Sequence, residues 1–163
     1  MEMSSNMRIR SYEPVRDLDR VRVLHDRSIR ALSGHLHPPE VFDRMQQRKE
    51  GEEFAVNLAS IHFFVAEDEA GRLLCTAGWQ AEPELALARI REVFVEPDLA
   101  RRGIASAMLR HVEADAIANG RTEFWLMSSV VAVPFYQRQG YEVEGEATDS
   151  DLPAIPMGKR TKR

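Results

Sequence analysis

The residues of this chain that could most clearly do chemistry follow a short apolar run in its second half. Residues 93–95 (Val-Phe-Val) are typical of a buried strand, and Pro97 limits the ladder pairing beyond them. Apolar residues then recur at helical spacing through residues 104–112, so the strand leads into a helix. The first backbone N–H groups of a helix have no intrahelical partner and carry positive partial charge. They therefore favour an anion, above all a phosphate.

The turn before that helix has the residue types that a phosphate site needs. Gly103 and Ala105 carry little or no side chain, so a ligand can approach the backbone, and Arg101 and Arg102 add two positive charges. Ser106, in the first helical turn, can donate its hydroxyl to the same phosphate. A phosphate-binding loop of the GxxxxGK[ST] type would need a Lys after Gly103, and none is there. A GxGxxG dinucleotide motif would need two further glycines, which are also absent. Neither of these two common nucleotide-binding motifs is therefore present.

A second motif lies about one strand-helix-strand unit further along. Asn119-Gly120 ends the helix, residues 122–127 have the pattern of the next strand, and A-V-P-F-Y-Q-R-Q-G-Y follows at residues 132–141. Together the two motifs resemble the GNAT N-acetyltransferase family, with its signatures Gln/Arg-x-x-Gly-x-Gly/Ala and Ala-x-x-Phe-Tyr-x-x-x-Gly-Phe/Tyr. The second signature is matched at every fixed position. In the first, Ala100 stands where the family usually has Gln or Arg, and Ser129 stands where many members carry Asn.

This resemblance implies that acetyl-CoA is the cosubstrate. In the family, the strand before the turn and the strand after the helix splay apart, and the pantetheine arm lies between them, in keeping with the placement of ligands at the carboxyl ends of parallel strands. One backbone N–H of the first strand is then expected to act as the oxyanion donor. The residues expected to bind the cosubstrate are Val93, Phe94, Val95, Arg101, Arg102, Gly103, Ile104, Ala105 and Ser106.

One catalytic candidate, Tyr136, follows from the same resemblance, and a second, Glu92, is chosen from the residues of this chain because the family's base does not carry over. Tyr136 occupies the position of the acid that stabilises or protonates the CoA thiolate, whose pKa should be about 8.5; the alternative is a core aromatic residue like Phe135. An amine acceptor must lose its proton, and Glu92 is the first candidate for the base, directly or through water; the alternative is a glutamate ion-paired with Arg91. In some relatives the glutamate lies three residues earlier, where this chain has Arg89.

The histidines fall into two groups. His35 and His37 lie between the first two predicted helices, a region that borders the acceptor pocket in this family, so they are candidate substrate-binding residues; the alternative is a pair of solvated loop residues. His25, His62 and His111 are scattered at spacings that make no ligand cluster, and no metal is expected.

The elements that must position these residues form an alternating pattern. The sequence predicts helices from Pro14 to Gly34 and from Pro38 through Met45, with residues 46–53 as a solvated helix end and loop. It predicts strands at residues 8–12, 61–66, 73–81 and 87–95, a hairpin turn at residues 67–72, and a closing antiparallel pair at residues 141–147 and 154–157. Trp79 and Trp125 are expected in the strand core. The fold class is α/β: a single-domain GNAT-like fold with a mixed, mostly antiparallel central sheet, a parallel strand-helix-strand unit at its centre and helices on both faces.

Composition limits the classes of function. The net charge of −4 disfavours nucleic-acid binding, which needs a basic face, and no apolar run approaches the length of a membrane span. Cys75 is the only cysteine, so no internal disulfide is expected and a cytoplasmic location is the default. We expect one acetyltransferase domain at residues 7–158, a flexible leader at 1–6 and a basic flexible tail at 159–163.

The sequence therefore predicts an acetyl-CoA-dependent N-acetyltransferase that acts on a primary amine, of a small molecule, by direct attack on the thioester. The expected partner is this small-molecule amine acceptor, with no nucleic acid and no membrane; a homodimer is compatible with the resemblance. Two alternatives remain open. One is an acyl-CoA-binding sensor or partner module without catalysis, and the other is a protein acetyltransferase acting on N-termini or lysines.

Overall fold

A seven-stranded sheet runs through the protein, and its order places the two strands of the expected cosubstrate site side by side. The computed structural model describes residues 6–161, and within them the strand order is β1-β2-β3-β4-β5-β7-β6. The strands are β1 (Arg8–Ser11), β2 (His62–Glu67), β3 (Leu73–Ala81), β4 (Leu87–Val95), β5 (Glu123–Ser129), β6 (Glu142–Val143) and β7 (Ala154–Arg160). Neighbouring strands are antiparallel except β4 and β5, which are parallel. The predicted mixed sheet with a central parallel unit is confirmed.

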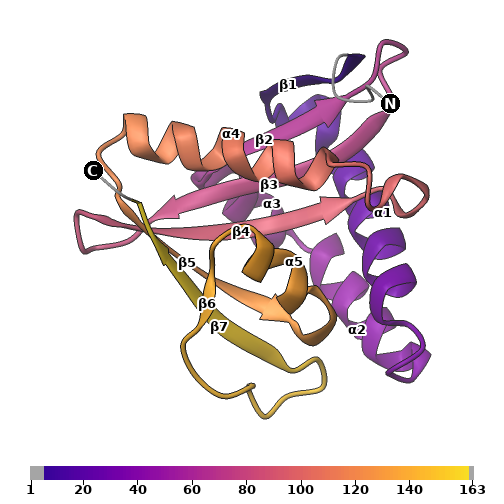
Figure 1. The fold of residues 1–163 in the computed structure, drawn as a ribbon. Coiled ribbons are helices and arrows are strands. Elements are labelled where there is room, and N and C mark those ends of the chain that lie inside the picture. Colours follow the sequence, from indigo (N-terminus) through magenta and orange to yellow (C-terminus); the bar gives the residue numbers. More distant parts are fainter. Residues whose placement is uncertain (1–5, 162–163) are drawn as a thin grey trace.

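Helices cover both faces of this sheet. They are α1 (Pro14–Ser33), α2 (Pro39–Glu50), α3 (Glu52–Ser60), α4 (Ile104–Ala118) and α5 (Val133–Arg138), with short 3-10 turns at Pro97–Leu99 and Val130–Ala132. Figure 1 shows α4 crossing one face of the sheet, while α1, α2 and α3 lie behind it. The predicted α/β architecture is therefore confirmed, with α4 as the crossover helix between the parallel strands.

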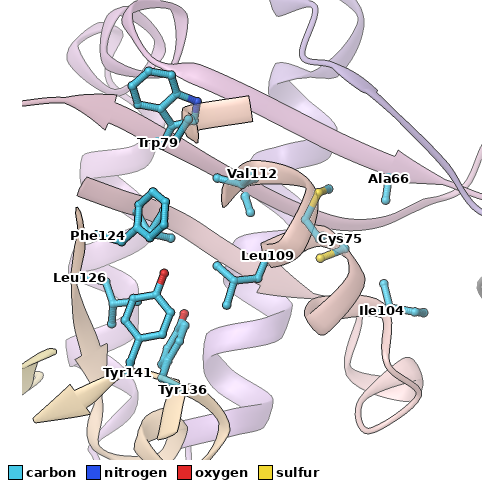
Figure 2. Close-up of a cluster of buried hydrophobic side chains, with 14 of the residues drawn as sticks. Ala66, Cys75, Trp79, Ile104, Leu109, Val112, Phe124, Leu126, Tyr136 and Tyr141 are labelled. Carbon is cyan, nitrogen blue, oxygen red and sulfur yellow. The ribbon is translucent and has the colours of Figure 1, made fainter. Parts of the chain in front are cut away.

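Two buried clusters hold these layers together. The larger one joins α4 to the sheet and includes Phe124 and Leu126 from β5, whose alternate residues face this helix. Figure 2 shows this cluster around Leu109 and Val112 of α4. The smaller cluster lies on the opposite face and consists of Val21, Leu24, Leu58, Phe63, Val65 and Leu73, from α1, α3, β2 and β3.

A group of ion pairs fastens the first strand to α1 and to the hairpin. Arg10 of β1 donates to both carboxylate oxygens of Asp17, at 2.8 Å each, and its Nε lies 3.2 Å from Oε1 of Glu67. Both carboxylates are buried. The hydrogen bond from Arg10 is the main cause that lowers the pKa of Glu67 to about 2. Glu67 is therefore ionised in the folded protein at neutral pH.

One segment of the first half differs from its prediction. Residues 46–53 were expected to be a solvated helix end and loop, but α2 continues to Glu50 and α3 begins at Glu52. Gly51, in extended conformation, is the only residue between the two helices. The polar composition of the stretch suggested a loop, yet Lys49 is half-buried and lies over the Phe54 ring of α3, with its Nζ 5.6 Å from the ring centroid.

The two ends of the chain also bear on predictions. β7 extends to Arg160, and Nζ of Lys159 lies 2.8 Å from Oε1 of Glu113, so the first residues of the expected flexible tail belong to the sheet. Residues 162–163 and residues 1–5 of the expected leader lie outside the described residues. Within residues 6–161, none of the helices is both long and apolar enough to cross a membrane.

Candidate active site

The parallel strands β4 and β5 separate partway along their length. They pair only at Leu87 with Glu123, Ala88 with Phe124, and Arg89 with Trp125. β4 then continues beside β3, and β5 continues beside β7, so within the described chain the facing edges of β4 and β5 have no strand partner beyond these pairs. Figure 1 shows the two arrows diverging toward their carboxyl ends. Backbone N–H and C=O groups at this edge are thus available to a ligand.

A β-bulge bends β4 at the point where the strands have separated. Glu92 has a φ of 56°, in the left-handed region, and together with Val93 it faces a single residue of β3, Ala77. The bulge changes which side chains face α4. Ala88 and Ile90 pack into the α4 cluster before it, whereas Val93 and Val95 do so after it.

Buried hydrogen bonds hold this bulge from the α1 side. Oγ1 of Thr76 donates to the carbonyl oxygen of Glu92 at 2.8 Å, and Nε2 of His25 lies 2.9 Å from the same hydroxyl. Because the single hydroxyl proton of Thr76 goes to Glu92, Nε2 of His25 must be the donor in the second bond. Nδ1 is then an acceptor, and Nζ of Lys49 lies 3.3 Å from it. Burial, followed by the charge of Lys49, lowers the pKa of His25 well below its usual value, so the ring is neutral.

Phe94, directly after the bulge, belongs to the same group. Its ring lies 4.0 Å, centroid to centroid, from that of His25, and Nζ of Lys49 lies 4.5 Å from the Phe94 centroid. Phe94 therefore faces α1 rather than α4. Burial lowers the pKa of Lys49, while Glu92 and Asp26 act in the opposite direction. β4 thus has an apolar side, which faces α4, and a polar and aromatic side, which faces α1.

The N-terminus of α4 has the features expected of an anion site. Gly103 precedes the helix with a φ of 79° and has no side chain that could cap the first turn, so among the described residues this N-cap position makes no side-chain hydrogen bond. A Cβ placed on Gly103 would meet none of the described residues' atoms within 4 Å. Arg101, with a φ of 66°, and Arg102 are both exposed in the preceding turn. The uncapped amides and the open side of Gly103 fit a pyrophosphate.

A hydrogen bond between Ser106 and Gln139 connects the first turn of α4 to the end of α5. The Ser106 hydroxyl accepts a hydrogen bond from Nε2 of Gln139 at 2.8 Å. Its own proton remains available for a ligand, because a hydroxyl both accepts and donates. Ile104 is buried and anchors the first turn in the core, while Ala105 is half-buried. These contacts hold the first turn of α4 in place, and its backbone amides point toward the preceding loop at residues 101–103.

Tyr136 of α5 lies in the same layer as α4. It is 8% exposed and packs edge-on against Phe135 and Tyr141, with ring centroids 5.0 and 5.8 Å apart. Figure 2 shows the rings of Tyr136 and Tyr141 next to each other below Leu109. Burial, and secondarily the nearby Cys75 thiol, raises the pKa of Tyr136 well above its ordinary value. The phenol is therefore protonated at neutral pH and can act as a hydrogen-bond or proton donor.

The remaining candidates lie on the α1 side. Glu92 is half-buried at the bulge, near enough to Lys49 and Arg89 to affect the pKa of each. His35 is exposed in the loop between α1 and α2, and His37 lies edge-on to Phe42 at 6.1 Å. The structure thus gathers the cosubstrate candidates and Glu92 around β4 and α4, but no contact joins either loop histidine to them within residues 6–161. Those residues also contain no cluster of potential metal ligands.

Sequence reasoning did not single out three residues that line this region. His25 was assigned to a scattered set, and Lys49 to a solvated stretch. Trp125 was expected in the strand core, but it is half-buried and stacks against Arg89, whose guanidinium carbon is 4.7 Å from the ring centroid. Only Trp79 is a core residue as predicted, at 1% exposure.

Comparison with solved structures assigns this fold to a class. The PaiA N-acetyltransferase of Thermoplasma acidophilum, solved in complex with coenzyme A, superposes with a TM-score of 0.81 at 18% identity, over 94% of this chain and 98% of that one. At this identity the likeness shows the fold, which is that of N-acetyltransferases.

Sequence comparison shows the family. Residues 59–143, just over half of the chain, match the acetyltransferase (GNAT) domain, so the chain belongs to the GNAT acetyltransferase family. An uncharacterized N-acetyltransferase of Methanocaldococcus jannaschii, MJ1207, is 34% identical over 87 residues, which cover 49% of this chain and 38% of that protein. The uncharacterized N-acetyltransferase YafP of Escherichia coli is 25% identical over 142 residues, 85% of this chain and 83% of its own length.

Proposed function

We propose that this protein transfers an acetyl group from acetyl-CoA to a primary amine of a small molecule, by direct attack of the amine on the thioester. The observation that carries the proposal is the conjunction of two features at one edge of the sheet: the unpaired edges of β4 and β5, and the uncapped N-terminus of α4 beside Gly103. The first suits the amide groups of a pantetheine arm, and the second suits its pyrophosphate.

Acetyl-CoA supplies an activated acyl group, and the chain has to bind, orient and polarise it. Arg101, Arg102 and the first amides of α4, from Ile104 to Ser106, would hold the pyrophosphate, with Ser106 donating its hydroxyl. Backbone groups of Val93, Phe94 and Val95 would bind the pantetheine, and one N–H among them would stabilise negative charge on the thioester oxygen. Such preorganised donors are usually the largest single contribution to acyl transfer.

Two side chains would handle protons on opposite sides of β4. Glu92 would accept a proton from the incoming ammonium group, directly or through a water molecule, because an alkyl amine with a pKa near 10 is mostly protonated at neutral pH. As the carbon–sulfur bond breaks, Tyr136 would donate its phenolic proton to the departing thiolate. His35 and His37 would contribute to the outer wall of the acceptor site.

An ion pair on the acceptor side supports a small molecule over a protein acceptor. Nη2 of Arg44 in α2 lies 2.7 Å from Oδ2 of Asp151 in the segment before β7. This contact connects α2, which packs against α1, to the segment that leads into β7, the antiparallel partner of β5. An extended peptide crossing here would have to break it, whereas a small amine would not.

The test is acceptor-dependent release of the CoA thiol from acetyl-CoA, measured across polyamines, amino acids, aminoglycosides and short peptides. We expect release with at least one small amine, together with a product that is heavier by one acetyl group. If no amine gives release while acetyl-CoA raises the melting temperature, the protein is a CoA-binding sensor and the proposed catalysis is wrong. Release with peptides alone would assign a protein acetyltransferase.

A further inference from the structure

Arg89 has an unusual environment for a guanidinium group. It belongs to the last pair of the parallel ladder, opposite Trp125, at the point where β4 and β5 separate. Its neighbours Ala88 and Ile90 face α4, so Arg89 lies on the opposite side of the sheet, the side of α1. The guanidinium carbon lies over the Trp125 ring, 4.7 Å from its centroid, a distance typical of a cation–π contact.

The guanidinium of Arg89 has no carboxylate partner in the part of the chain that the structure describes. Among residues 6–161, Arg89 makes no ion pair, and its Nε is buried without a hydrogen-bond partner. Arg10, another half-buried arginine, shows the contrast, since it is paired with both Asp17 and Glu67. Arg89 is half-buried, and burying a polar atom such as its Nε without a hydrogen-bond partner costs free energy, so this arrangement needs an explanation.

Other charges nearby do not satisfy it. Arg91, on the same face, donates to Oε1 of Gln80 at 2.9 Å and adds a second positive charge. Burial and then the charge of Arg91 lower the pKa of Arg89, while Glu82 and Glu92 act at longer range in the opposite direction. Lys49 lies beyond the bulge against Phe94. The α1 side of β4 thus presents three cations, Arg89, Arg91 and Lys49, and Glu92 is the carboxylate that acts on both Arg89 and Lys49.

We infer that Arg89 binds a carboxylate of the acceptor, so that the substrate class is an amine that also carries a carboxylate, such as an amino acid. This inference rests on the proposed acetyl transfer. The planar fork of a guanidinium matches a carboxylate in two parallel hydrogen bonds, and the contact with the Trp125 ring restrains its position in advance. Glu92 lies three residues along the same strand, so one small molecule can place its carboxylate at Arg89 and its amine near Glu92.

The experiment compares matched acceptors. Leucine, leucinamide and 3-methylbutylamine form one set, which carries a carboxylate, an amide or a hydrogen atom at the same position. Lysine, lysinamide and cadaverine form a second set with the same three groups. We expect kcat/KM to be highest for the free amino acid in each set. The amide has the less basic amine and therefore more of its neutral form, so poorer turnover of the amide cannot be attributed to protonation. O-phosphoethanolamine beside ethanolamine distinguishes a phosphate from a carboxylate as the preferred anion.

Variants of the arginine connect the preference to this residue. Arg89→Gln should lower kcat/KM for the amino acid about tenfold to a hundredfold, the range expected for hydrogen bonds to a charged group. It should leave the decarboxylated amine and the KM of acetyl-CoA nearly unchanged, and Arg89→Lys should retain part of the preference. The control is Arg160→Gln, which removes the same charge from an exposed position on β7, paired with Glu123 at the start of β5, and should change neither value.

Each outcome decides the question. Equal turnover of an amino acid and its decarboxylated amine by the wild-type protein, or an equal loss on both in Arg89→Gln, would overturn the inference and leave acetyl transfer intact. A preference for O-phosphoethanolamine over every carboxylate would also overturn it. If no amine in the panel is acetylated, acetyl-CoA binding measured by the shift in melting temperature shows whether the cosubstrate site exists without the proposed catalysis, and the carboxylate inference falls in either case.

Discussion

Two neighbouring tyrosines differ in what their hydroxyl groups contact. Tyr141 donates to Oε2 of Glu113 at 2.8 Å, and the other oxygen of this carboxylate pairs with Lys159. The hydroxyl of Tyr136 has no such protein partner within residues 6–161, although its ring is buried. The hydroxyl of Tyr141 thus has a structural role in the core, whereas the hydroxyl proton of Tyr136 is available for donation to a ligand.

Replacement of Tyr136 by Phe should therefore affect chemistry more than binding. A well-placed general acid contributes roughly a hundredfold or more to turnover, so we expect Tyr136→Phe to lower kcat by about this factor with little change in the KM of acetyl-CoA. Steady-state kinetics of thiol release check this prediction.

The matched control is Tyr141→Phe. It removes a hydroxyl from the adjacent ring and leaves Glu113 with Lys159 alone, so it should lower the melting temperature and leave kcat close to the wild-type value. Equal kcat for the wild-type protein and Tyr136→Phe would show that the phenol is dispensable.

At the scale of single residues, the sequence predicted the candidate site residues that lie within local motifs. It missed those that only contacts between distant parts of the chain bring to the site. Tyr136 and Gly103 stand within recognisable motifs. His25 lies four residues after Val21, so helix periodicity could have placed it on the buried face. Its partners Thr76 and Lys49, however, are 51 and 24 residues away, and no pattern predicts these contacts. The same holds for Arg89 and Trp125, which meet only because β4 and β5 pair.

Among the elements, α4 has a proposed ligand site at its N-terminus, whereas no ligand is proposed at its C-terminus. Gly103 before the helix and Gly120 after it have φ values of 79° and 86°, and a Cβ on either would meet no described atom within 4 Å. A side chain at either position therefore costs similar backbone strain, about 1 to 2 kcal/mol. Only Gly103 lies beside the expected pyrophosphate.

Because Gly103 and Gly120 have similar conformations and similar free space, the same substitution at both positions gives a matched pair of variants. Gly103→Glu places bulk and negative charge in the anion site, and we expect the Kd of acetyl-CoA to rise about tenfold or more. Gly120→Glu should lower the melting temperature by a similar amount and leave the Kd unchanged. Isothermal titration of each variant with acetyl-CoA measures the difference, and normal affinity in Gly103→Glu would contradict the proposed cradle.

Element boundaries were predictable wherever composition and periodicity agreed. The limits of β4, the hairpin turn before β3 and the end of α4 at Asn119 follow from apolar runs, glycine and helical spacing. α3 was missed because the polar residues before it were interpreted as solvated, and its short apolar segment was left unassigned. The bulge in β4 was missed because a continuous apolar run carries no information about the side of the sheet that each residue faces.

For the molecule as a whole, the cluster around Glu67 links stability to pH. The folded pKa of Glu67 is lowered from 4.5 to about 2, chiefly by the hydrogen bond from Arg10. A lowered pKa stabilises the folded state above the unfolded pKa, and this contribution disappears as the pH falls from 4.5 to about 2. Since each pKa unit corresponds to about 1.4 kcal/mol, the loss is about 3 kcal/mol.

Glu67→Gln should remove this dependence. We expect a lower free energy of unfolding at pH 7 and a flatter profile below pH 4.5 in urea titrations followed by circular dichroism. Glu69→Gln, an exposed residue of the same hairpin, removes the same charge and should keep the wild-type profile. A wild-type profile in Glu67→Gln would show that the ion pairs do not stabilise the fold.

The bulge at Glu92 also determines how this strand can change during evolution. If Glu92 were deleted, Val93 and Val95 would still fall on the α4 side under regular alternation, in step with Ala88 and Ile90. Glu92 is thus an inserted residue that the packing of β4 against α4 does not require, and the chain has its candidate base at that position. Its side chain can be exchanged, and with it the proton chemistry of the site, while the residues that hold the strand in the sheet keep their packing.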